Sequence, residues 1–266
     1  MDLSRHNKKA WNKEVEKENI WTRPVDSDTI KKAKRGQWEV FLTPEKPVPR
    51  EWFPELSGKK VQGLASGGGQ QCPIFAALGA IVTVFDNSPA QLEQDRKVAK
   101  RENLSLKLEE GDMRDLSRFP DGSFFLIFHP VSNCFIDDIK GVWKECFRVL
   151  KPGGILLSGF CNPVMYIFDL NEWEENNRLR VKYSIPYSDT EQLSTSELKA
   201  RIKKEMPLEF GHSLENQIGG QLEAGFVITD FYEDRGEDFL DPYIPAFMAT
   251  KAVKRSTTPA CRGGSL

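Results

Sequence analysis

Between residue 60 and about residue 160, short apolar runs alternate with longer amphipathic stretches. The apolar runs are rich in β-branched and aromatic residues, which predicts buried strands, and the amphipathic stretches predict helices. We expect strands at residues 61–64, 81–85, 104–109, 124–128 and 155–160. We expect helices at residues 7–19, 27–36, 70–78, 89–102 and 137–150. This alternation predicts an α/β fold with a doubly wound, mostly parallel sheet that is covered on both faces.

The helix expected at residues 137–150 carries the clearest amphipathic pattern. Its apolar residues recur three and four positions apart, which places them on one buried face. They are Ile139, Val142, Trp143, Cys146, Phe147 and Leu150. A further helix at residues 213–224 precedes two strands, at residues 226–232 and 246–253, which we expect to complete the sheet.

Two segments depart from the alternation. Residues 1–57 combine helical stretches with a proline-rich aromatic stretch, and we expect them to form an N-terminal helical extension that covers the main domain. Residues 163–210 change from aromatic to acidic to polar, and we expect them to form an inserted lid. The main domain is expected to span residues 58–254, followed by a disordered tail at residues 255–266.

The charges of the chain nearly balance. Lys and Arg number 37 and Asp and Glu 39, so the formal net charge is −2. Such a protein has no overall field that attracts nucleic acid or an anionic membrane, although a local basic patch is compatible with this balance. The charged N-terminal residues indicate no signal peptide, and no apolar run approaches the roughly 18 residues that a membrane span requires. We therefore expect a cytoplasmic protein without a membrane partner, for which nucleic acid is a disfavoured partner.

The cysteines are odd in number and widely spread. No two of them have CxxC spacing, so neither a metal site nor a disulfide framework is indicated, and we expect free thiols. The five cysteines are Cys72, Cys134, Cys146, Cys161 and Cys261.

A glycine-rich turn joins the strand at residues 61–64 to the following helix. Glycine lets the backbone approach a ligand closely, and the start of a helix presents free N–H groups. Such a turn occurs in many nucleotide-binding α/β proteins and also as a purely structural element. The turn consists of Ala65, Ser66, Gly67, Gly68 and Gly69.

Two later turns carry polar residues at the ends of the next strands. Asp86 follows the strand at residues 81–85, where a carboxylate can accept hydrogen bonds from both hydroxyls of a ribose, or alternatively can stabilise the start of a helix. Gly111, Asp112 and Met113 follow the third strand, where Asp112 can accept from an adenine amine, or where the segment can be a surface turn. Successive parallel strands end at one sheet edge, so the three turns predict a nucleoside site there.

The order of these turns, together with RVLKPGG at residues 148–154, resembles the class I S-adenosylmethionine-dependent methyltransferases, in particular their small-molecule branch. The resemblance covers residues 58–160 and extends to about residue 253. It implies a Rossmann-like sheet with a closing antiparallel strand and S-adenosyl-L-methionine as the cofactor. The residues implied in cofactor binding are Ala65, Ser66, Gly67, Gly68 and Gly69 at the turn, Asp86 and Asn87 at the ribose, Asp112 and Met113 at the adenine, and His129.

The chain departs from the family pattern at two positions. The family carries an acidic residue two positions before the turn, where this chain has Gly63, and its first turn glycine is Ala65 here. Without that acid, the cofactor ammonium would be held by backbone carbonyls of the turn, by the segment after the fourth strand, or by Gln70 and Gln71. A dinucleotide dehydrogenase is disfavoured, because Cys72 stands where its motif requires a third glycine.

The segment after the fourth strand supplies the catalytic candidates. Methyl transfer requires a base only if the acceptor loses a proton. His129 is the first candidate for that base, with the alternative that it hydrogen-bonds a loop carbonyl, and Ser132 and Asn133 are candidates to orient the acceptor or to cap the next helix. His212 is a weaker candidate. The aromatic residues that could cover the pocket are Trp11, Trp21, Trp38, Phe41, Tyr166, Phe168 and Trp173.

The resemblance leads to one principal function and two alternatives. We expect an S-adenosylmethionine-dependent methyltransferase that acts on a small-molecule acceptor. The first alternative is methylation of nucleic acid or protein by the same fold. The second is a regulatory protein that binds the cofactor without catalysis, which the departure at Gly63 suggests.

Overall fold

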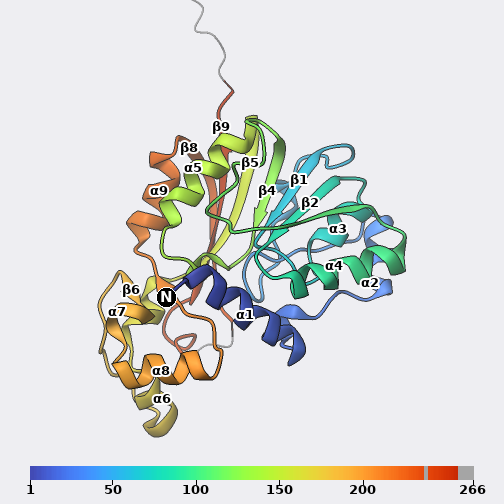
Figure 1. Ribbon diagram of the computed structural model, residues 1–266. Helices are drawn as coiled ribbons and strands as arrows, with labels where there is room; N and C mark the ends of the chain where they lie inside the picture. Colours follow the sequence, from blue (N-terminus) through green and yellow to red (C-terminus); the bar gives the residue numbers. More distant parts are fainter. Residues whose placement is uncertain (237–238, 257–266) are drawn as a thin grey trace, which may run out of the picture.

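The computed structural model describes residues 1–236 and 239–256 (Figure 1). Cys261 and residues 257–266 of the predicted disordered tail lie outside the described residues. In the part of the chain that is described, no helix has the length and apolar character required to cross a membrane.

A seven-stranded sheet forms the centre of the molecule, with the strand order β3-β2-β1-β4-β5-β9-β8. The first five strands in this order are parallel to one another, whereas β9 runs antiparallel to both β5 and β8. The predicted doubly wound, Rossmann-like sheet with a closing antiparallel strand is thereby confirmed. The strands are β1 (Lys60–Leu64), β2 (Ile81–Asp86), β3 (Leu106–Glu110), β4 (Phe124–His129), β5 (Leu150–Cys161), β8 (Phe226–Asp234) and β9 (Phe247–Lys254).

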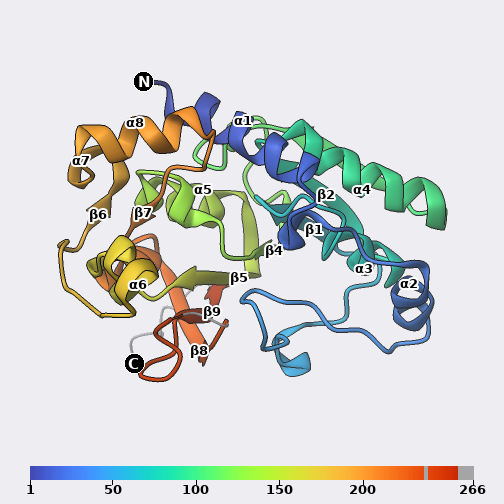
Figure 2. The same ribbon diagram turned by 90° about the horizontal axis from the view of Figure 1, so that it is seen from below.

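Each face of the sheet is buried under its own layer of helices (Figures 1 and 2). Because successive strand residues point to opposite faces, Val61 belongs to one core cluster and Leu64 to the other. Packed on the Val61 side are α2 (Ser27–Lys34), α3 (Cys72–Ala77) and α4 (Pro89–Glu102). On the Leu64 side, α5 (Ile139–Val149) inserts Val142 and Trp143, and α9 (Gly220–Glu223) lies beside it after a π-helical turn, Glu215–Gly219.

The structure moves the first predicted helix from residues 7–19 to Leu3–Glu16 and moves the start of the fifth predicted strand by five residues. Residues 151–154 were expected to end the helix and precede a strand, but β5 begins directly at Leu150. The pairing of β4 with β5 contains a register shift between Phe124 and Leu126, and Gly154 lies close to the carbonyl of Lys151. The glycines are therefore part of an irregular strand, in which they allow close packing of the backbone.

The N-terminal extension crosses the carboxyl end of the sheet. It consists of α1 (Leu3–Glu16), a 3-10 turn at Ile20–Thr22, α2, and residues 37–57, which include a second 3-10 turn at Arg50–Trp52. We call residues 40–48 the strap. Its Leu42 carbonyl accepts a hydrogen bond from Val131 N (2.9 Å) and lies so close to β5 that a Cβ on Gly159 would approach it to 2.1 Å.

Residues 163–210 form a small unit at one end of the molecule, beside the N-terminus (Figure 2). The unit contacts α1: Asn7 exchanges hydrogen bonds with Leu208, and Lys13 pairs with Glu205 at 2.6 Å. Its elements are a 3-10 turn (Pro163–Ile167), α6 (Leu170–Asn176), β6 (Tyr187–Ser188), α7 (Asp189–Gln192), α8 (Thr195–Lys203) and, extending past residue 210, β7 (Phe210–Gly211).

Candidate functional site

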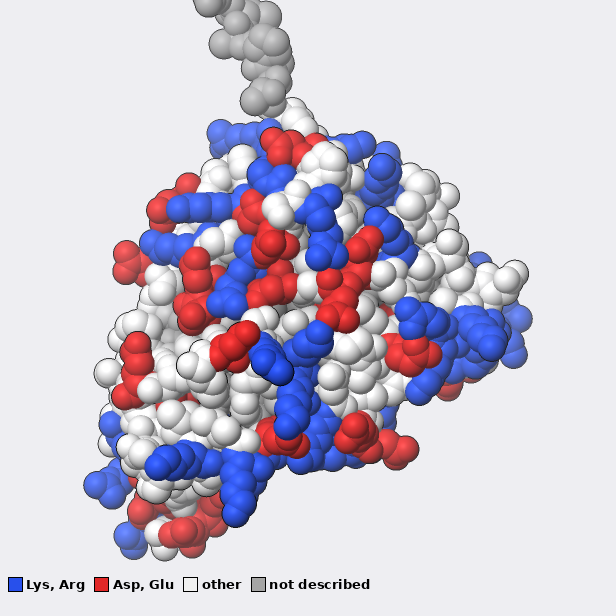
Figure 3. All heavy atoms as spheres, in the orientation of Figure 1, with Lys and Arg blue, Asp and Glu red and all other residues white. Residues whose placement is uncertain are grey.

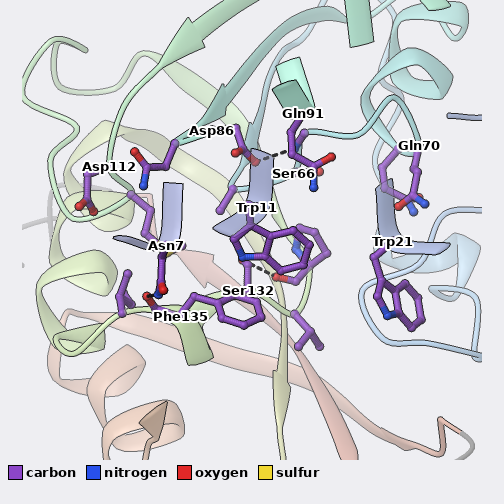
Figure 4. Close-up of a pocket in the computed structure, with 18 of the residues that line it drawn as sticks. Asn7, Trp11, Trp21, Ser66, Gln70, Asp86, Gln91, Asp112, Ser132 and Phe135 are labelled. Atoms are coloured by element: carbon purple, nitrogen blue, oxygen red, sulfur yellow. Dashed lines mark hydrogen bonds between the residues drawn. The ribbon is translucent and has the colours of Figure 1, made fainter. Parts of the chain in front are cut away.

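A pocket of about 270 Å³ lies at the carboxyl ends of β1 to β4, beneath α1 and the strap (Figure 4). This is the edge at which the three sequence turns were expected to meet. Figure 4 shows Asp86 and Asp112 on one side of Trp11, and Trp21 with Gln70 on the other. From the predicted cofactor set, the pocket is lined by Ala65, Ser66, Gly67, Asp86, Asn87, Asp112 and Met113.

The glycine turn is fixed by α4 as well as by its own backbone. Gly68 donates its N–H to Asp95 Oδ2 at 3.0 Å, and a Cβ on Gly67 would lie 2.7 Å from Gln91 Cβ. Gly68 and Gly69, which were also predicted to bind the cofactor, face α4 and the extension and are not among the residues that line the pocket. The Gly68 amide therefore stabilises the turn, and Gly67 is the glycine whose backbone lies at the pocket.

Asp86 stands at the end of β2 and faces Gly67. Its Oδ2 accepts from Gly67 N at 2.9 Å and its Oδ1 from Ser88 N at 2.8 Å. Burial raises the pKa of Asp86, which the two backbone hydrogen bonds oppose. Each carboxylate oxygen retains acceptor capacity after one bond, so Asp86 can accept from two neighbouring hydroxyls. Asn87 lies beside it and donates to the Ser4 carbonyl of α1 at 2.9 Å.

Asp112 is paired with Arg114 in a bidentate contact. Arg114 Nη2 lies 2.7 Å from Asp112 Oδ2 and Nε lies 3.0 Å from Oδ1, while Nη1 reaches Asp137 at 2.6 Å. Burial raises the pKa of Asp112, but the hydrogen bonds from Arg114 outweigh it and leave the pKa lowered. Asp112 is therefore an oriented carboxylate at the pocket wall, next to the thioether of Met113.

Cys72 accounts for the missing acid at Gly63. A Cβ built on Gly63 would lie 2.1 Å from Cys72 Sγ, so the thiol occupies the space that an acidic side chain would need. The same thiol lies 3.9 Å from the carbonyl and the hydroxyl of Ser66. Burial raises the pKa of Cys72 well above its usual range, and the group is thus a neutral thiol.

The three predicted catalytic residues take different positions. His129 is fully buried and does not line the pocket. Its Nδ1 donates to the Leu64 carbonyl at 2.9 Å, which agrees with the alternative that this histidine hydrogen-bonds a backbone carbonyl. Burial lowers its pKa to about 4. Asn133 is also buried and bonds Gln217 at 2.9 Å. Ser132 does line the pocket, with its hydroxyl bonded to the Pro130 carbonyl. The cap of α5 is Asp138, and neither Ser132 nor Asn133 fills that role.

The pocket is covered by the N-terminal extension. Trp11 of α1 packs edge-on against Phe135, with the ring centroids 5.0 Å apart, and Trp21 and Phe41 also line the pocket. The other aromatic candidates, Trp38, Tyr166, Phe168 and Trp173, do not line it. Neither does any described residue of the predicted lid at residues 163–210, which instead holds α1. His212 lies behind the wall, within hydrogen-bond distance of the carbonyls of Asn133 and Ile136.

Sequence reasoning missed several residues of this cover. Leu3 and Asn7 precede the predicted cover residue Trp11 at intervals of four on α1, and all three line the pocket, so this spacing would have placed the two missed residues on the same helix face. The strap residues Leu42 to Pro44 lie in irregular structure, for which the sequence pattern gives no register.

The remaining side chains of the wall are amides, hydroxyls, aliphatic groups and aromatic rings. Among the described residues that line the pocket, the ionisable ones are Asp86, Asp112 and Arg114. All three lie at the ends of β2 and β3, where the nucleoside turns meet. Outside this region the described lining residues therefore include no charged group and no side chain of a strong general base.

Comparison with known proteins connects this site to one family. A family model for a methyltransferase domain matches residues 63–158. The chain is 53% identical over 252 residues to the uncharacterized methyltransferase YbaJ of Bacillus subtilis, a match that covers 95% of this chain and 98% of that protein. It is 39% identical over 101 residues to the sterol 24-C-methyltransferase erg6 of Aspergillus fumigatus, which spans 37% of this chain and 26% of that protein.

Solved structures share the fold. The crystal structure of an S-adenosylmethionine dependent methyltransferase from Mesorhizobium loti superposes with a TM-score of 0.58 at 18% identity, and the match covers 77% of this chain and 94% of that one. This similarity supports the fold described above.

Proposed function

The chain belongs to the class I S-adenosylmethionine-dependent methyltransferases, and from this premise we propose that it transfers a methyl group to a small-molecule acceptor held in the covered pocket. The resemblance drawn from the sequence is confirmed, as is S-adenosyl-L-methionine as the cofactor, and the enzyme is favoured over a regulatory protein without catalysis. The single observation that carries the proposal is the pocket itself, which joins the nucleoside turns to an uncharged space under α1.

The chemistry of the residues at the sheet edge, and their order along it, fit the parts of the cofactor. Asp86 would accept from the ribose hydroxyls, Asp112 and Met113 would adjoin the adenine, and the backbone of Ser66 and Gly67 would adjoin the methionine portion. When bound, the cofactor supplies a methyl group on a positively charged sulfur. The protein holds the acceptor near that group and excludes water, which is a large part of what a displacement reaction requires.

The cover supports a small acceptor over a nucleic acid or protein. The pocket volume of about 270 Å³ lies just below the roughly 300–1,000 Å³ typical of ligand sites. The lysines of α1 that could contact an anionic polymer are in part neutralised, since Lys8 pairs with Glu110 and Lys13 with Glu205. Figure 3 shows Lys and Arg mixed with Asp and Glu on the face in view.

Calorimetric titration with S-adenosylmethionine and S-adenosylhomocysteine tests the cofactor site. Asp86→Asn should weaken binding about 10- to 100-fold, because a hydrogen bond to a charged group is worth about 1.5–3 kcal/mol. The matched control is Asp121→Asn, which removes a carboxylate that is 80% exposed and should leave binding unchanged. Equal binding by the wild type and Asp86→Asn would contradict the assignment.

The acceptor class is tested by transfer of a labelled methyl group in a cell extract. The extract is separated by ultrafiltration into low-molecular-mass and macromolecular fractions, and each is offered to the enzyme with labelled cofactor. We expect label in the low-molecular-mass fraction. Label in nuclease-sensitive or protease-sensitive material would favour the alternative of nucleic acid or protein methylation.

A further inference from the structure

Among the residues that the structure describes, those of the pocket beyond the nucleoside turns offer an acceptor no base. The described ionisable residues of the wall are Asp86, Asp112 and Arg114, and each is engaged: Asp86 by two backbone amides, and Asp112 and Arg114 by each other. The two buried histidines, His129 and His212, are not among the lining residues, and their ring nitrogens bond the backbone carbonyls of Leu64 and Ile136. The polar groups that remain are amides and hydroxyls, which do not take up a proton at neutral pH.

From this composition, and resting on the proposed function, we infer that the acceptor is a neutral molecule whose attacking atom has a lone pair and no proton to lose. An aromatic ring nitrogen of the pyridine type and a thioether sulfur both meet this description. The acceptor's shape should be compact and largely apolar, because the uncharged wall is dominated by Trp11, Trp21, Phe41, Leu42, Val131 and Phe247.

The chemistry of such an acceptor balances without a proton. Its lone pair forms the new bond to the methyl carbon while the carbon–sulfur bond breaks and that electron pair remains on the sulfur. The acceptor atom gains one positive charge and the sulfur loses one, so the net charge in the pocket does not change. A phenol or alcohol would instead have to release a proton during attack, which needs a base within hydrogen-bond reach.

The wall also disfavours an anionic acceptor. A carboxylate or phenolate would have to leave water for an apolar site, which is costly unless a cation pairs with it. The one cation of the described wall, Arg114, already pairs with Asp112 at 2.7 Å and with Asp137 at 2.6 Å. Aromatic rings favour a positive charge over a negative one, because their faces attract a cation. Trp11 and Phe41 therefore suit the charge that the product would carry.

A matched series of bicyclic aromatic compounds tests the inference. Quinoline presents a ring nitrogen, methyl 2-naphthyl sulfide a thioether, 2-naphthol a hydroxyl and 2-naphthoate a carboxylate, on frameworks of similar size. Formation of S-adenosylhomocysteine is followed for each. We expect turnover with quinoline or the sulfide and none above background with the naphthol or the naphthoate.

Binding supplies a readout that is independent of turnover. With S-adenosylhomocysteine bound, the cation N-methylquinolinium should bind at least about 10-fold more tightly than 2-naphthoate in calorimetry. Trp11→Leu should weaken binding of the cation about 3- to 30-fold, the range expected for loss of one cation–π contact. Trp11→Phe should retain most of the affinity. The matched control is Trp173→Leu, because Trp173 packs on Phe239 and does not line the pocket.

Three outcomes would overturn the inference. Methylation of the naphthol or naphthoate would show that a base or a paired cation serves the acceptor. Normal cofactor binding with neither turnover nor binding of the ring nitrogen and sulfur compounds would reject this acceptor class and leave the proposed function intact. Failure to bind S-adenosylmethionine or S-adenosylhomocysteine would reject the proposed function itself, and the inference with it.

Discussion

Ala65 adopts a backbone conformation that favours glycine. Its φ is 46°, in the left-handed region, and its N–H donates to the Phe85 carbonyl at 2.7 Å, which holds it there. An L-residue with a Cβ loses roughly 1–2 kcal/mol in this region. We predict that Ala65→Gly raises the free energy of unfolding by up to about 1 kcal/mol, since glycine's greater freedom in the unfolded chain offsets part of the relief. Urea denaturation measures this change in the free energy of unfolding. A lower value for Ala65→Gly than for the wild type would contradict the proposed strain at Ala65.

His129 predicts a pH dependence of stability. Burial lowers its pKa to about 4 from an ordinary value of 6.5, so the unfolded chain binds a proton that the folded protein does not. Stability contributed by neutral His129 is therefore fully present above pH 6.5 and is lost as the pH falls toward 4, by about 3 kcal/mol in all. Denaturant titrations across this range should show a shallower slope for His129→Gln than for the wild type.

The comparison between those two proteins isolates His129 from other groups. Burial raises the pKa values of Asp86 and Asp95, and these carboxyls act in the opposite direction over part of the same range. Their contribution is common to both proteins and cancels in the difference. Parallel pH curves for the wild type and His129→Gln would contradict the assignment.

The sequence predicted single residues well where strand ends define their position. Asp86, Asp112 and Met113 line the pocket because each follows a strand whose end the apolar pattern had located. His129 also ends a strand, but the alternation of strand side chains turns it inward, to the Leu64 carbonyl. Glycine rather than an acid stands at position 63 because Cys72, on the following helix, fills the space that a side chain would need. Such a tertiary contact is not visible in the sequence pattern.

At the scale of elements, the buried side chain of Asn7 helps to hold α1 over the pocket. The Asn7 side chain donates to the carbonyls of Phe135 (2.8 Å) and Leu208 (3.0 Å) and accepts from Leu208 N (2.8 Å). Because the site is buried, Asn7→Ala would leave these backbone groups unpaired, at roughly 1–3 kcal/mol each. We predict that the variant exposes α1 to trypsin at its lysines and speeds release of S-adenosylhomocysteine.

A surface asparagine provides the control for this prediction. Asn176 lies at the end of α6, is exposed, and bonds Glu172 within the same helix, so Asn176→Ala should match the wild type in cleavage rate. Equal trypsin sensitivity of the wild type and Asn7→Ala would show that other contacts, such as Trp11 with Phe135, suffice to hold α1.

The accuracy of the sequence predictions differed between elements. The strands and helices from residue 60 to residue 160 were located within a few residues because apolar runs and amphipathic spacing define them independently of their partners. The covering role was assigned in part to residues 163–210, whereas the described pocket is covered by α1 and the strap. Which of two irregular segments reaches a site is decided by contacts such as Asn7 with Leu208, and composition does not encode them.

For the whole molecule, cofactor binding should raise thermal stability. A ligand at 100 times its dissociation constant adds about 2.7 kcal/mol to the free energy of unfolding. In a chain of this size that corresponds to a rise in Tm of about 5–10 °C. Differential scanning fluorimetry with S-adenosylhomocysteine should show this rise for the wild type and a smaller one for Asp86→Asn at the same concentration. An equal rise in both proteins would place the ligand elsewhere.

The contact between α1 and the insertion has a consequence for the order of events during synthesis. Asn7 and Leu208 are separated by 201 positions, so at roughly 5–20 residues per second α1 leaves the ribosome about 10–40 s before its partner exists. Throughout that interval α1 lacks its buried partner Leu208, while Asn87, Glu110 and Phe135, which also contact α1, have already been made. Attachment of α1 through Asn7 is therefore completed only after Leu208 has been made, late in translation.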